Sequence, residues 1–357
     1  MEYNLQEIAK KFKLELNCEP YGNGHINDTY IINNAPRYIL QRINSDVFTK
    51  PEEVMENIEA VTDHLRKKIA AAGGDVCRET LTLIQTDDGR SFYKADENNY
   101  FRVYRFIENA VSYDRVENPV QFYNAAKAFG KFQNMLSDFP ADRLHETIKK
   151  FHDTRSRFEA FRQSVKADVC GRAKYVVPEI EFVLSRESDC GVIVNATADG
   201  SVPIRVTHND TKLNNVMLDS RTGEGVCVID LDTVMPGSLL YDFGDAVRFG
   251  ASSGDEDETD LSKIYMSEEL FEQFSRGFLE ETASVMTDME KELLPFSAKL
   301  MTLECGMRFL TDYLSGDTYF KIHRKNHNLD RARTQFRLVK DMEDKADTMR
   351  KIVDKYC

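Results

Sequence analysis

One stretch of the sequence is more informative than any other: it reads V-T-H-N-D-T-K-L-N-N-V-M-L, from Val206 to Leu218. A glycine-containing turn follows, and a second apolar run then leads to Asp230 in V-C-V-I-D-L-D. Short apolar runs bounded by turn residues are typical of strands. The pattern predicts a β-rich island at Ile204–Leu231 whose strands deliver Asp210, Asn215 and Asp230 to loop ends.

These three side chains have the chemistry that phosphoryl transfer requires. A carboxylate such as Asp210 can accept the proton of an attacking hydroxyl, while an amide and a second carboxylate hold a metal ion that bridges nucleotide phosphates. Magnesium takes hard oxygen ligands and needs few of them from the protein, so Asn215 and Asp230 are sufficient. The sequence therefore predicts ATP as co-substrate and Mg²⁺ as cofactor.

The spacing strengthens this interpretation. The protein-kinase catalytic loop reads H-R-D-L-x-x-x-N, and here His208 precedes Asp210 while Asn215 follows at the same offset. Lys212 stands two residues after the Asp, where it can reach a transferring phosphate. The alternative is an acidic hairpin in which Asn and Asp are only turn residues. That alternative explains Asn215 or Asp230 singly, but it explains both at these offsets poorly.

Asp242 begins the triplet D-F-G, which has the spelling of a kinase metal-binding motif. It lies twelve residues past Asp230 and does not end an apolar strand. We therefore expect Asp230 to bind the metal. We expect Asp242 to cap a helix and to brace the catalytic loop by accepting backbone hydrogen bonds.

The remaining sequence divides into a strand-rich beginning and a helical remainder. Residues 1 to about 107 predict five strands, with a helix inserted after the third that starts at Pro51 and ends before Gly73. Two of these strand pieces flank the turn at Asp87–Gly89. Beyond Pro119 apolar residues recur mainly at helical spacing. The predicted fold class is α+β.

Composition narrows the function classes. The 357 residues carry 47 Lys and Arg against 60 Asp and Glu, a formal charge of -13, which argues against binding to nucleic acid or to a membrane surface. The N-terminus does not resemble a signal peptide, and no apolar run is long enough to span a membrane. Seven scattered cysteines without a C-x-x-C pair predict free thiols in a reducing cytoplasm. We expect a cytoplasmic monomer, and we expect the acidic run Asp255–Glu258 to be a solvated loop.

The sequence resembles the superfamily of aminoglycoside phosphotransferases and choline kinases, and more closely the N-acetylhexosamine 1-kinases. The segments that carry the resemblance are E-P-Y-G-N-G-H-I-N-D-T-Y from Glu19, Y-I-L-Q-R-I-N from Tyr38, the catalytic-loop stretch, V-I-D-L-D-T-V-M-P-G from Val228, D-F-G-D-A-V-R-F-G from Asp242 and E-C-G-M-R-F-L-T-D-Y from Glu304. The resemblance implies a bilobed protein-kinase-like fold. Its small N-lobe, residues 1–107, would hold the nucleotide on a five-stranded antiparallel sheet. Its larger, mainly helical C-lobe, residues 108–357, would hold the catalytic loop, the metal and the sugar.

The resemblance also implies roles for individual residues. Asp210 would be the catalytic base, and Asn215 and Asp230 would bind magnesium. The residues implied near the sugar are His25, Phe249, Arg308 and Tyr319. Aromatic faces suit a pyranose ring, and Arg and His can hydrogen-bond its hydroxyl or acetamide groups.

The nucleotide site departs from the protein-kinase pattern. A protein kinase has a Lys on the third strand that contacts the phosphates, whereas Gln41 and Arg42 occupy that place here. Strand alternation lets only one of the two face the nucleotide, and Arg42 is the candidate for neutralising the phosphates. The other predicted nucleotide-binding residues are Gly22 and Gly24, through backbone N–H groups, and Phe106 and Ile107, at the hinge.

Other functions stay open at this point. The acceptor could be another small alcohol, such as choline, an aminoglycoside or methylthioribose, although the chain has no Trp for a quaternary-ammonium cage. The absent strand Lys also allows a nucleotide-binding module without turnover. A metal-dependent phosphohydrolase would usually need more converging His and Asp ligands than the sequence offers.

Overall fold

The computed structural model describes residues 3–15, 17–22 and 26–357. The chain divides into two compact units. The first unit consists of Met1–Ser112, Asp138–Lys149 and Val216–Pro236, and the second consists of Tyr113–Ser137, Lys150–Asn215 and Gly237–Cys357. The predicted division at residue 107 lies close to the first of these boundaries. The first unit also takes in two later segments, which the sequence prediction had assigned to the second part.

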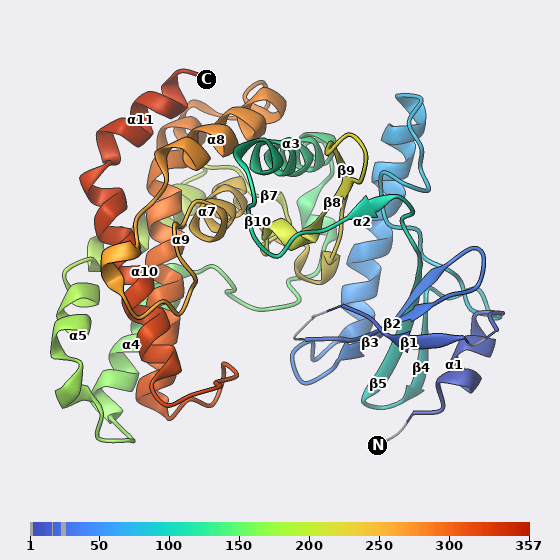
Figure 1. The fold of residues 1–357 in the computed structure, drawn as a ribbon, viewed down its shortest axis with the longest axis horizontal. Coiled ribbons are helices and arrows are strands. Elements are labelled where there is room, and N and C mark those ends of the chain that lie inside the picture. Colours follow the sequence, from blue (N-terminus) through green and yellow to red (C-terminus); the bar gives the residue numbers. More distant parts are fainter. Residues whose placement is uncertain (1–2, 16, 23–25) are drawn as a thin grey trace. The chain divides into compact units, whose positions relative to one another are not determined.

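The first unit is built on a five-stranded antiparallel sheet with the strand order β1-β2-β3-β5-β4, drawn in blue to teal in Figure 1. The strands are β1 (Cys18–Pro20), β2 (Asp28–Ile32), β3 (Tyr38–Asn44), β4 (Phe92–Asp96) and β5 (Asn99–Arg105). Helix α1 (Leu5–Lys11) precedes the sheet, and α2 (Pro51–Ala71) follows its third strand in the chain. The predicted α+β class, the antiparallel five-stranded sheet and the inserted helix are thereby confirmed.

One predicted strand piece is wrong. Before the turn at Asp87–Gly89 the chain forms only an isolated bridge, between Leu83 and Tyr104, and β4 begins after the turn at Phe92. The segment exchanges only two backbone hydrogen bonds with β5, from Ile84 N–H to the Val103 carbonyl and from Arg105 N–H to the Thr82 carbonyl, both at 2.9 Å. The Leu81 carbonyl accepts from the Arg66 side chain instead.

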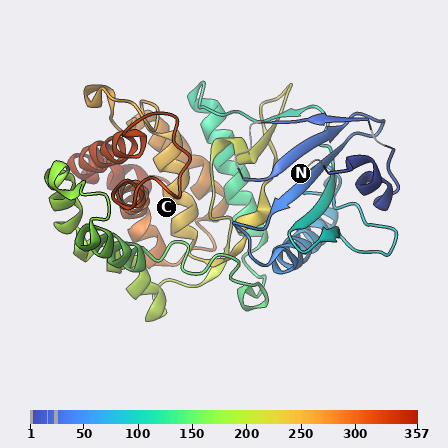
Figure 2. The same ribbon diagram turned by 90° about the horizontal axis from the view of Figure 1, so that it is seen from below.

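The two faces of the sheet have different surroundings, because side chains alternate along each strand. One face packs against α1 in a core of Ile8, Phe12, Ile32, Leu40, Phe101 and Val103. Gln41 and Arg102, which are cross-strand partners, lie on the opposite face. There a guanidinium nitrogen of Arg102 lies 3.9 Å from the sulfur of Met55 on α2. Figure 2 shows the sheet and both helices of this unit from below.

A second, three-stranded sheet explains why residues 216–236 belong to the first unit. It has the order β6-β8-β9, with β6 (Ala110–Val111), β8 (Val216–Asp219) and β9 (Gly225–Val228). Its register pairs Ala110 with Asp219. Farther along the segment, the side chain of Asn57 on α2 donates to the carbonyl of Val234 at 2.9 Å. These contacts between distant parts of the chain cannot be read from local periodicity.

Asp219 makes a pH-dependent contribution to the stability of the first unit. Its carboxylate accepts hydrogen bonds from the backbone N–H groups of Thr222 and Arg221 at 3.0 and 2.9 Å, and it lies 2.6 Å from Arg78. These contacts lower the pKa of Asp219 from 3.8 to about 2. A carboxyl with a lowered folded-state pKa contributes stability above its unfolded pKa, and this contribution is lost as the pH falls through the folded pKa.

We therefore expect Asp219→Asn to lower the free energy of unfolding at neutral pH, and the difference from wild type to shrink as the pH falls from about 4 to about 2. Urea unfolding followed by far-UV circular dichroism measures it. Asp255→Asn, at a carboxylate that is about half exposed, is the matched control and should show little effect. A difference that stays constant across this pH range would contradict the assignment.

The second unit is mainly helical. Its α-helices are α3 (Pro119–Met135), α4 (Thr154–Ala167), α5 (Val177–Leu184), α6 (Val192–Ala198), α7 (Leu239–Gly250), α8 (Glu268–Thr282), α9 (Asp288–Ser315), α10 (His327–Asp344) and α11 (Ala346–Asp354). The long helix α9 packs against α4, α7 and α10, and α3 packs against α8 (Figure 1). One strand of the predicted β-island, β7 (Arg205–Thr207), belongs to this unit. A further short strand, β10 (Met235–Gly237), lies beyond the predicted island, where the chain passes from the first unit into the second. The predicted helical remainder is confirmed.

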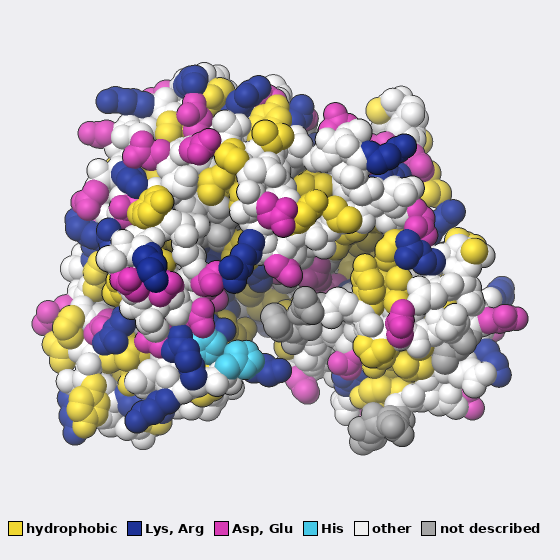
Figure 3. All heavy atoms as spheres, in the orientation of Figure 1, with side chains coloured by type: hydrophobic (Ala, Val, Ile, Leu, Met, Phe, Trp, Pro, Cys, Tyr) yellow, Lys and Arg dark blue, Asp and Glu magenta, His cyan; other side chains and the backbone are white. Residues whose placement is uncertain are grey.

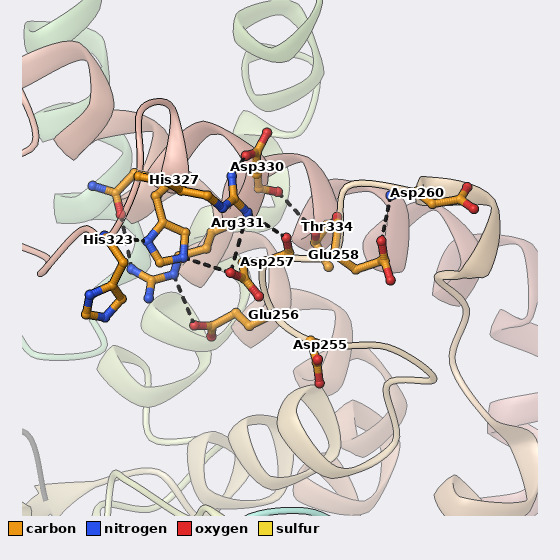
Figure 4. A network of polar contacts seen from close by, with 12 residues as sticks. Asp255, Glu256, Asp257, Glu258, Asp260, His323, His327, Asp330, Arg331 and Thr334 are labelled. Carbon is orange, nitrogen blue, oxygen red and sulfur yellow. Dashed lines mark hydrogen bonds and ion pairs between the residues drawn. The ribbon is translucent and has the colours of Figure 1, made fainter. Parts of the chain in front are cut away.

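The acidic run Asp255–Glu258 is more structured than a solvated loop. Figure 4 shows it reaching residues of α10: Asp257 lies 2.9 Å from the ring nitrogen of His327, and the Thr334 hydroxyl donates to the Glu258 carbonyl at 2.9 Å. Glu256 accepts a hydrogen bond from Arg248 at 3.0 Å. The run is a loop, as predicted, and Asp255 is exposed, but Glu256, Asp257 and Glu258 are only partly exposed. The prediction of full solvation is wrong because their partners come from distant helices.

The surface carries charges of both signs: on the face in Figure 3, Lys and Arg side chains are interspersed with Asp and Glu. Within the described ranges, no helix combines the length and the apolar character that crossing a bilayer demands. The seven cysteines are free thiols.

Candidate active site

The loop after β7 is held by a buried carboxylate. Asp242, on the first turn of α7 and 1% exposed, accepts hydrogen bonds from the backbone N–H groups of His208 and Asn209 at 2.8 and 2.7 Å. Its own backbone carbonyl accepts from the Thr211 hydroxyl at 2.6 Å. Burial raises the pKa of Asp242, against the opposing effect of His208 and these N–H groups. The side chain of Gln133 also donates to this carboxylate.

The predicted capping role falls to a different residue. The N-cap of α7 is Ser238, whose hydroxyl accepts from the N–H of Leu240 at 3.2 Å. Asp242 lies too far into the helix to cap it, and its carboxylate is directed at the preceding loop instead.

The backbone of Asn209 and the aromatic neighbours of His208 fix the course of the loop. Asn209 has a left-handed φ of +64°, which few non-glycine residues adopt. The ring of His208 lies 5.8 and 6.0 Å from the rings of Phe129 and Phe132 on α3. The Asp210 backbone N–H donates to Nδ1 of His208 at 3.3 Å. The loop is therefore fixed on both sides of Asn209, immediately before the predicted base.

Asp210 lies beside the two neighbours that the sequence pattern singled out. The ammonium group of Lys212 is 2.7 Å from Oδ1 of Asp210, and Nδ2 of Asn215 donates to the Asp210 carbonyl and to Oδ2 at 2.8 and 3.3 Å. The negative charge of Asp210 holds the pKa of Lys212 above its ordinary value. The structure thus brings Asp210, Lys212 and Asn215 together around one partly exposed carboxylate.

The predicted magnesium ligands have suitable donor atoms. Asn215 uses its amide nitrogen toward Asp210, which leaves its carbonyl oxygen, the atom a hard cation prefers, outside these two bonds. Asp230 belongs to the first unit and follows β9, with a left-handed φ of +59°. Among the described residues no group of three or more His, Cys, Asp or Glu is placed to hold a metal, but a nucleotide-bridging magnesium does not require one.

Three residues of α9 form a stripe at spacings of four, Glu304, Arg308 and Asp312, so they share one face of the helix. Both oxygens of buried Glu304 are occupied: Oε1 lies 2.9 Å from Nδ1 of His152, and Oε2 accepts from Thr154 at 2.5 Å. Burial by itself would raise the pKa of Glu304, but these partners lower it below its ordinary value. The glutamate is therefore a fixed negative charge in the interior.

His152 connects this stripe to the catalytic loop. Its Nε2 lies 3.1 Å from the carbonyl oxygen of Asn209, while Nδ1 faces Glu304. The Asn209 carbonyl can only accept, so Nε2 is the donor to it, and the His152 ring bridges the catalytic loop and Glu304. Sequence reasoning missed His152 and the role of Glu304. The one available signal was the E-C-G-M-R-F-L-T-D-Y segment, whose polar residues recur at helical spacing.

Arg308 and Tyr319, two of the predicted sugar residues, lie close together. The Arg308 guanidinium is 5.8 Å from the Tyr319 ring, and it is 5.7 and 5.5 Å from the rings of Phe151 and Phe320. Asp312 fixes this segment by accepting from the backbone N–H groups of Tyr319 and Phe320 at 2.8 and 2.9 Å. Within the described part of the chain, Arg308 has no hydrogen-bond or ion-pair partner of its own.

Other predicted site residues are less informative. Phe249 is partly buried near the end of α7, which packs against α9. His25 and Gly24 lie outside the described residues. Gly22 has a φ of +77°, in the region that glycine favours, and an added Cβ would meet open space. The space around Gly22 therefore does not test its predicted role, which is to offer a backbone N–H to a phosphate.

The predicted nucleotide residues of β3 point in opposite directions. Gln41 bonds to Thr29 and to Arg102, whereas Arg42 bonds to Asn99 at 2.6 Å and to Asp28 at 3.1 Å on the α1 side of the sheet. Only Gln41 therefore lies on the face that carries Arg102.

The two predicted hinge residues differ in exposure and partners. The ring of Phe106 lies 4.0 Å from the guanidinium of Arg37, and its backbone N–H donates to the Arg37 carbonyl at 3.0 Å. Ile107 is 7% exposed. Because its N–H is occupied, Phe106 could offer a nucleotide base only its ring or its carbonyl.

The fold is similar to that of several solved phosphotransferases. An aminoglycoside phosphotransferase from Alicyclobacillus acidocaldarius has a TM-score of 0.66 and 10% sequence identity over 99% of this chain and 98% of that one. A microcompartment-associated aminopropanol kinase has a TM-score of 0.58 and 16% identity over 97% of both chains. A spectinomycin phosphotransferase in complex with ADP and spectinomycin has a TM-score of 0.53 and 13% identity, covering 99% of this chain and 97% of that one. At these identities the likeness shows the shared kinase-like fold alone.

The sequence itself supplies the stronger comparison. The model of the phosphotransferase enzyme family (APH) matches residues 17–281, a span that contains β1–β9, the catalytic loop and Asp242. The match covers well over half of the chain and includes the residues around which the loop geometry is built. This chain therefore belongs to the phosphotransferase enzyme family.

Proposed function

We propose that this phosphotransferase is a small-molecule kinase that uses ATP and magnesium to phosphorylate the anomeric hydroxyl of N-acetylhexosamines, N-acetylglucosamine or N-acetylgalactosamine. The observation that carries the proposal is the braced loop that presents the Asp210 carboxylate between Lys212 and Asn215. Phosphoryl transfer depends mainly on positioning and on electrostatic stabilisation, so a rigid loop of this kind is what the reaction needs.

Each residue of the loop has a role in this proposal. Asp210 orients the sugar hydroxyl and takes its proton late, because the transition state is loose. Lys212 adds positive charge near the transferring group. Asn215 and Asp230 would hold the magnesium, whose chemistry is to bridge the nucleotide phosphates and neutralise their developing charge.

The α9 stripe supports a neutral, hydroxyl-rich acceptor. Arg308 is a donor without a protein partner in the described part of the chain, and it lies among aromatic rings that could cover a sugar face. An arginine in this position would repel a cationic acceptor such as choline or an aminoglycoside, whereas it could donate to an acetamide carbonyl. The resemblance to the N-acetylhexosamine 1-kinases points to the same substrates.

Phosphorus NMR tests the proposal directly. The full chain is incubated with ATP, magnesium and each N-acetylhexosamine, and a signal for an anomeric phosphate is expected. A 6-phosphate, or no sugar product, would overturn the sugar 1-kinase assignment. ADP release with choline, an aminoglycoside or methylthioribose would identify one of the other kinases. Nucleotide binding without ADP release on any acceptor would indicate a module without turnover.

Arg308→Met should raise the KM for the sugar by about tenfold, with little change in the KM for ATP. A hydrogen bond to a charged group contributes roughly 1.5–3 kcal/mol, and about 1.4 kcal/mol corresponds to tenfold in affinity. Steady-state kinetics with each substrate varied in turn measures both constants. Arg337→Met is the control, since Arg337 lies on α10 with only a 3.9 Å ion pair to Asp341. Equal sugar KM values for wild type and Arg308→Met would exclude this role.

A further inference from the structure

A buried arginine occupies the first unit where the strands β3 and β5 pair. Arg102 on β5 is 1% exposed and lies directly across from Gln41 on β3. Its Nε and Nη2 atoms donate to the Gln41 side-chain oxygen at 3.1 and 2.9 Å. Its third nitrogen, Nη1, lies 2.5 Å from Oδ1 of Asp232. All three guanidinium nitrogens are thus engaged inside the protein.

Asp232 ties this cation to the turn that begins with the predicted metal ligand. It is 2% exposed and lies in the short helix Leu231–Thr233, whose N-cap is Asp230 in a left-handed conformation, φ +59° and ψ +56°. The second oxygen of Asp232 accepts from Nδ2 of Asn27 at 2.6 Å. The Asp232 carboxylate therefore anchors this turn to strand β5 and to the residue just before β2.

Arg102 and Asp232 are the opposite charges at the centre of this cluster. Burial by itself would lower the pKa of Arg102, but the nearby carboxylate of Asp232, and more weakly that of Asp230, raise it above its ordinary value. Arg102 is therefore a permanent cation beside two acidic side chains. Removing it would leave Asp232 as a buried charge without its counter-ion, which is energetically costly.

We propose that Arg102 is a positioning residue for nucleotide and metal binding: through Asp232 it holds the Asp230 turn, and in this chain it replaces the ion pair between strand Lys and helix Glu of protein kinases. In those enzymes that pair must be in place for catalysis. Here Gln41 stands at the place of the strand Lys. Its side-chain oxygen accepts hydrogen bonds from Arg102, and Gln41 brings no positive charge to the phosphates. The inference rests on the proposed ATP- and metal-dependent function.

Two observations favour positioning over direct phosphate binding. The Arg102 side chain is almost completely buried, and its nitrogens already serve Gln41 and Asp232. A residue that orients a metal ligand acts from such a position, and loss of such outer partners typically costs about 10–100-fold in metal affinity.

The test is calorimetric titration of the full chain with AMP-PNP and magnesium, which needs no sugar acceptor. The double variant Arg102→Met with Asp232→Asn, called the neutral pair, removes both charges together and so leaves neither one buried alone. The new amide can still accept a hydrogen bond from Asn27 through its oxygen. We expect AMP-PNP·Mg affinity to fall by at least about tenfold and the magnesium concentration for half-saturation to rise by a similar factor.

Two single variants serve as comparisons for the neutral pair. Arg102→Lys, which keeps the charge without the fork, should lie between wild type and the neutral pair. Arg78→Met, which removes an ion pair of the same unit, is the control and should stay within about twofold of wild type.

The outcomes separate this inference from the proposed function. A folded neutral pair, by far-UV circular dichroism, that binds AMP-PNP and magnesium like wild type would overturn the positioning role. If the neutral pair does not fold, Arg102→Lys decides the question, because it keeps a cation beside Asp232; binding of AMP-PNP and magnesium like wild type by that variant would then overturn the positioning role. Wild type that binds no nucleotide would refute the proposed kinase itself. Wild type that binds nucleotide but makes no sugar phosphate would refute only the sugar assignment.

Discussion

Asp210→Asn should lower kcat by about a hundredfold to ten-thousandfold while ATP binding persists. Asparagine has nearly the same shape, but it cannot take the proton of the attacking hydroxyl, and positioned general bases contribute about this much. It also removes the negative partner of Lys212, now 2.7 Å away. Because the brace at His208 and Asn209 does not involve the Asp210 side chain, the loop should keep its course.

Single-turnover and steady-state rates with the accepted sugar measure this effect, and nucleotide affinity comes from calorimetry. Asp255→Asn makes the same chemical change on an exposed loop and should leave kcat unaltered. Normal turnover by Asp210→Asn would remove Asp210 from the mechanism. A loss of kcat accompanied by loss of ATP binding would assign it to nucleotide binding instead.

Asp242→Asn should have the largest effect on stability, a loss of roughly 2–5 kcal/mol in the free energy of unfolding. The carboxylate receives two backbone N–H groups on its two oxygens, at 2.8 and 2.7 Å, in a site that is 1% exposed. An amide group offers only one acceptor oxygen, so its NH₂ would face a buried N–H donor. The loop before Asp210 would loosen, and kcat should fall with stability.

Urea unfolding followed by far-UV circular dichroism measures this change, which suits a chain without Trp. Asp255→Asn again serves as control. An unchanged unfolding midpoint for Asp242→Asn would mean that the brace contributes nothing to stability, and unchanged kcat would mean that it does not position Asp210.

Local sequence patterns were sufficient to predict much of the fold and the residues of the catalytic loop. Strand-like runs at residues 29–32, 37–43 and 100–107 and the helical spacing after Pro51 predicted strands and a helix where β2, β3, β5 and α2 lie. The antiparallel arrangement was implied by the family resemblance. The kinase-like offset singled out Asp210 and Asn215, and the structure places the Asn215 amide nitrogen 3.3 Å from the Asp210 carboxylate, since a short loop keeps near neighbours together. Local pattern failed where the partners of a residue are far away in the chain. The run Asp255–Glu258 was predicted to be solvated, but cationic and polar residues of distant helices contact Glu256, Asp257 and Glu258.

The sequence by itself determined that this chain has a strand-rich beginning, a helical remainder and a loop with the residues for phosphoryl transfer, because those features depend on spacings of a few residues. Only the tertiary structure decided which distant groups support that loop and which support the turn of Asp230, the predicted metal ligand. His152 and Glu304 are 152 positions apart in the chain, and Arg102 on β5 reaches Asp232 in the turn that follows β9. No periodicity relates such residues; they meet because burying a charge is tolerable only where folding supplies an opposite charge or a hydrogen-bond partner.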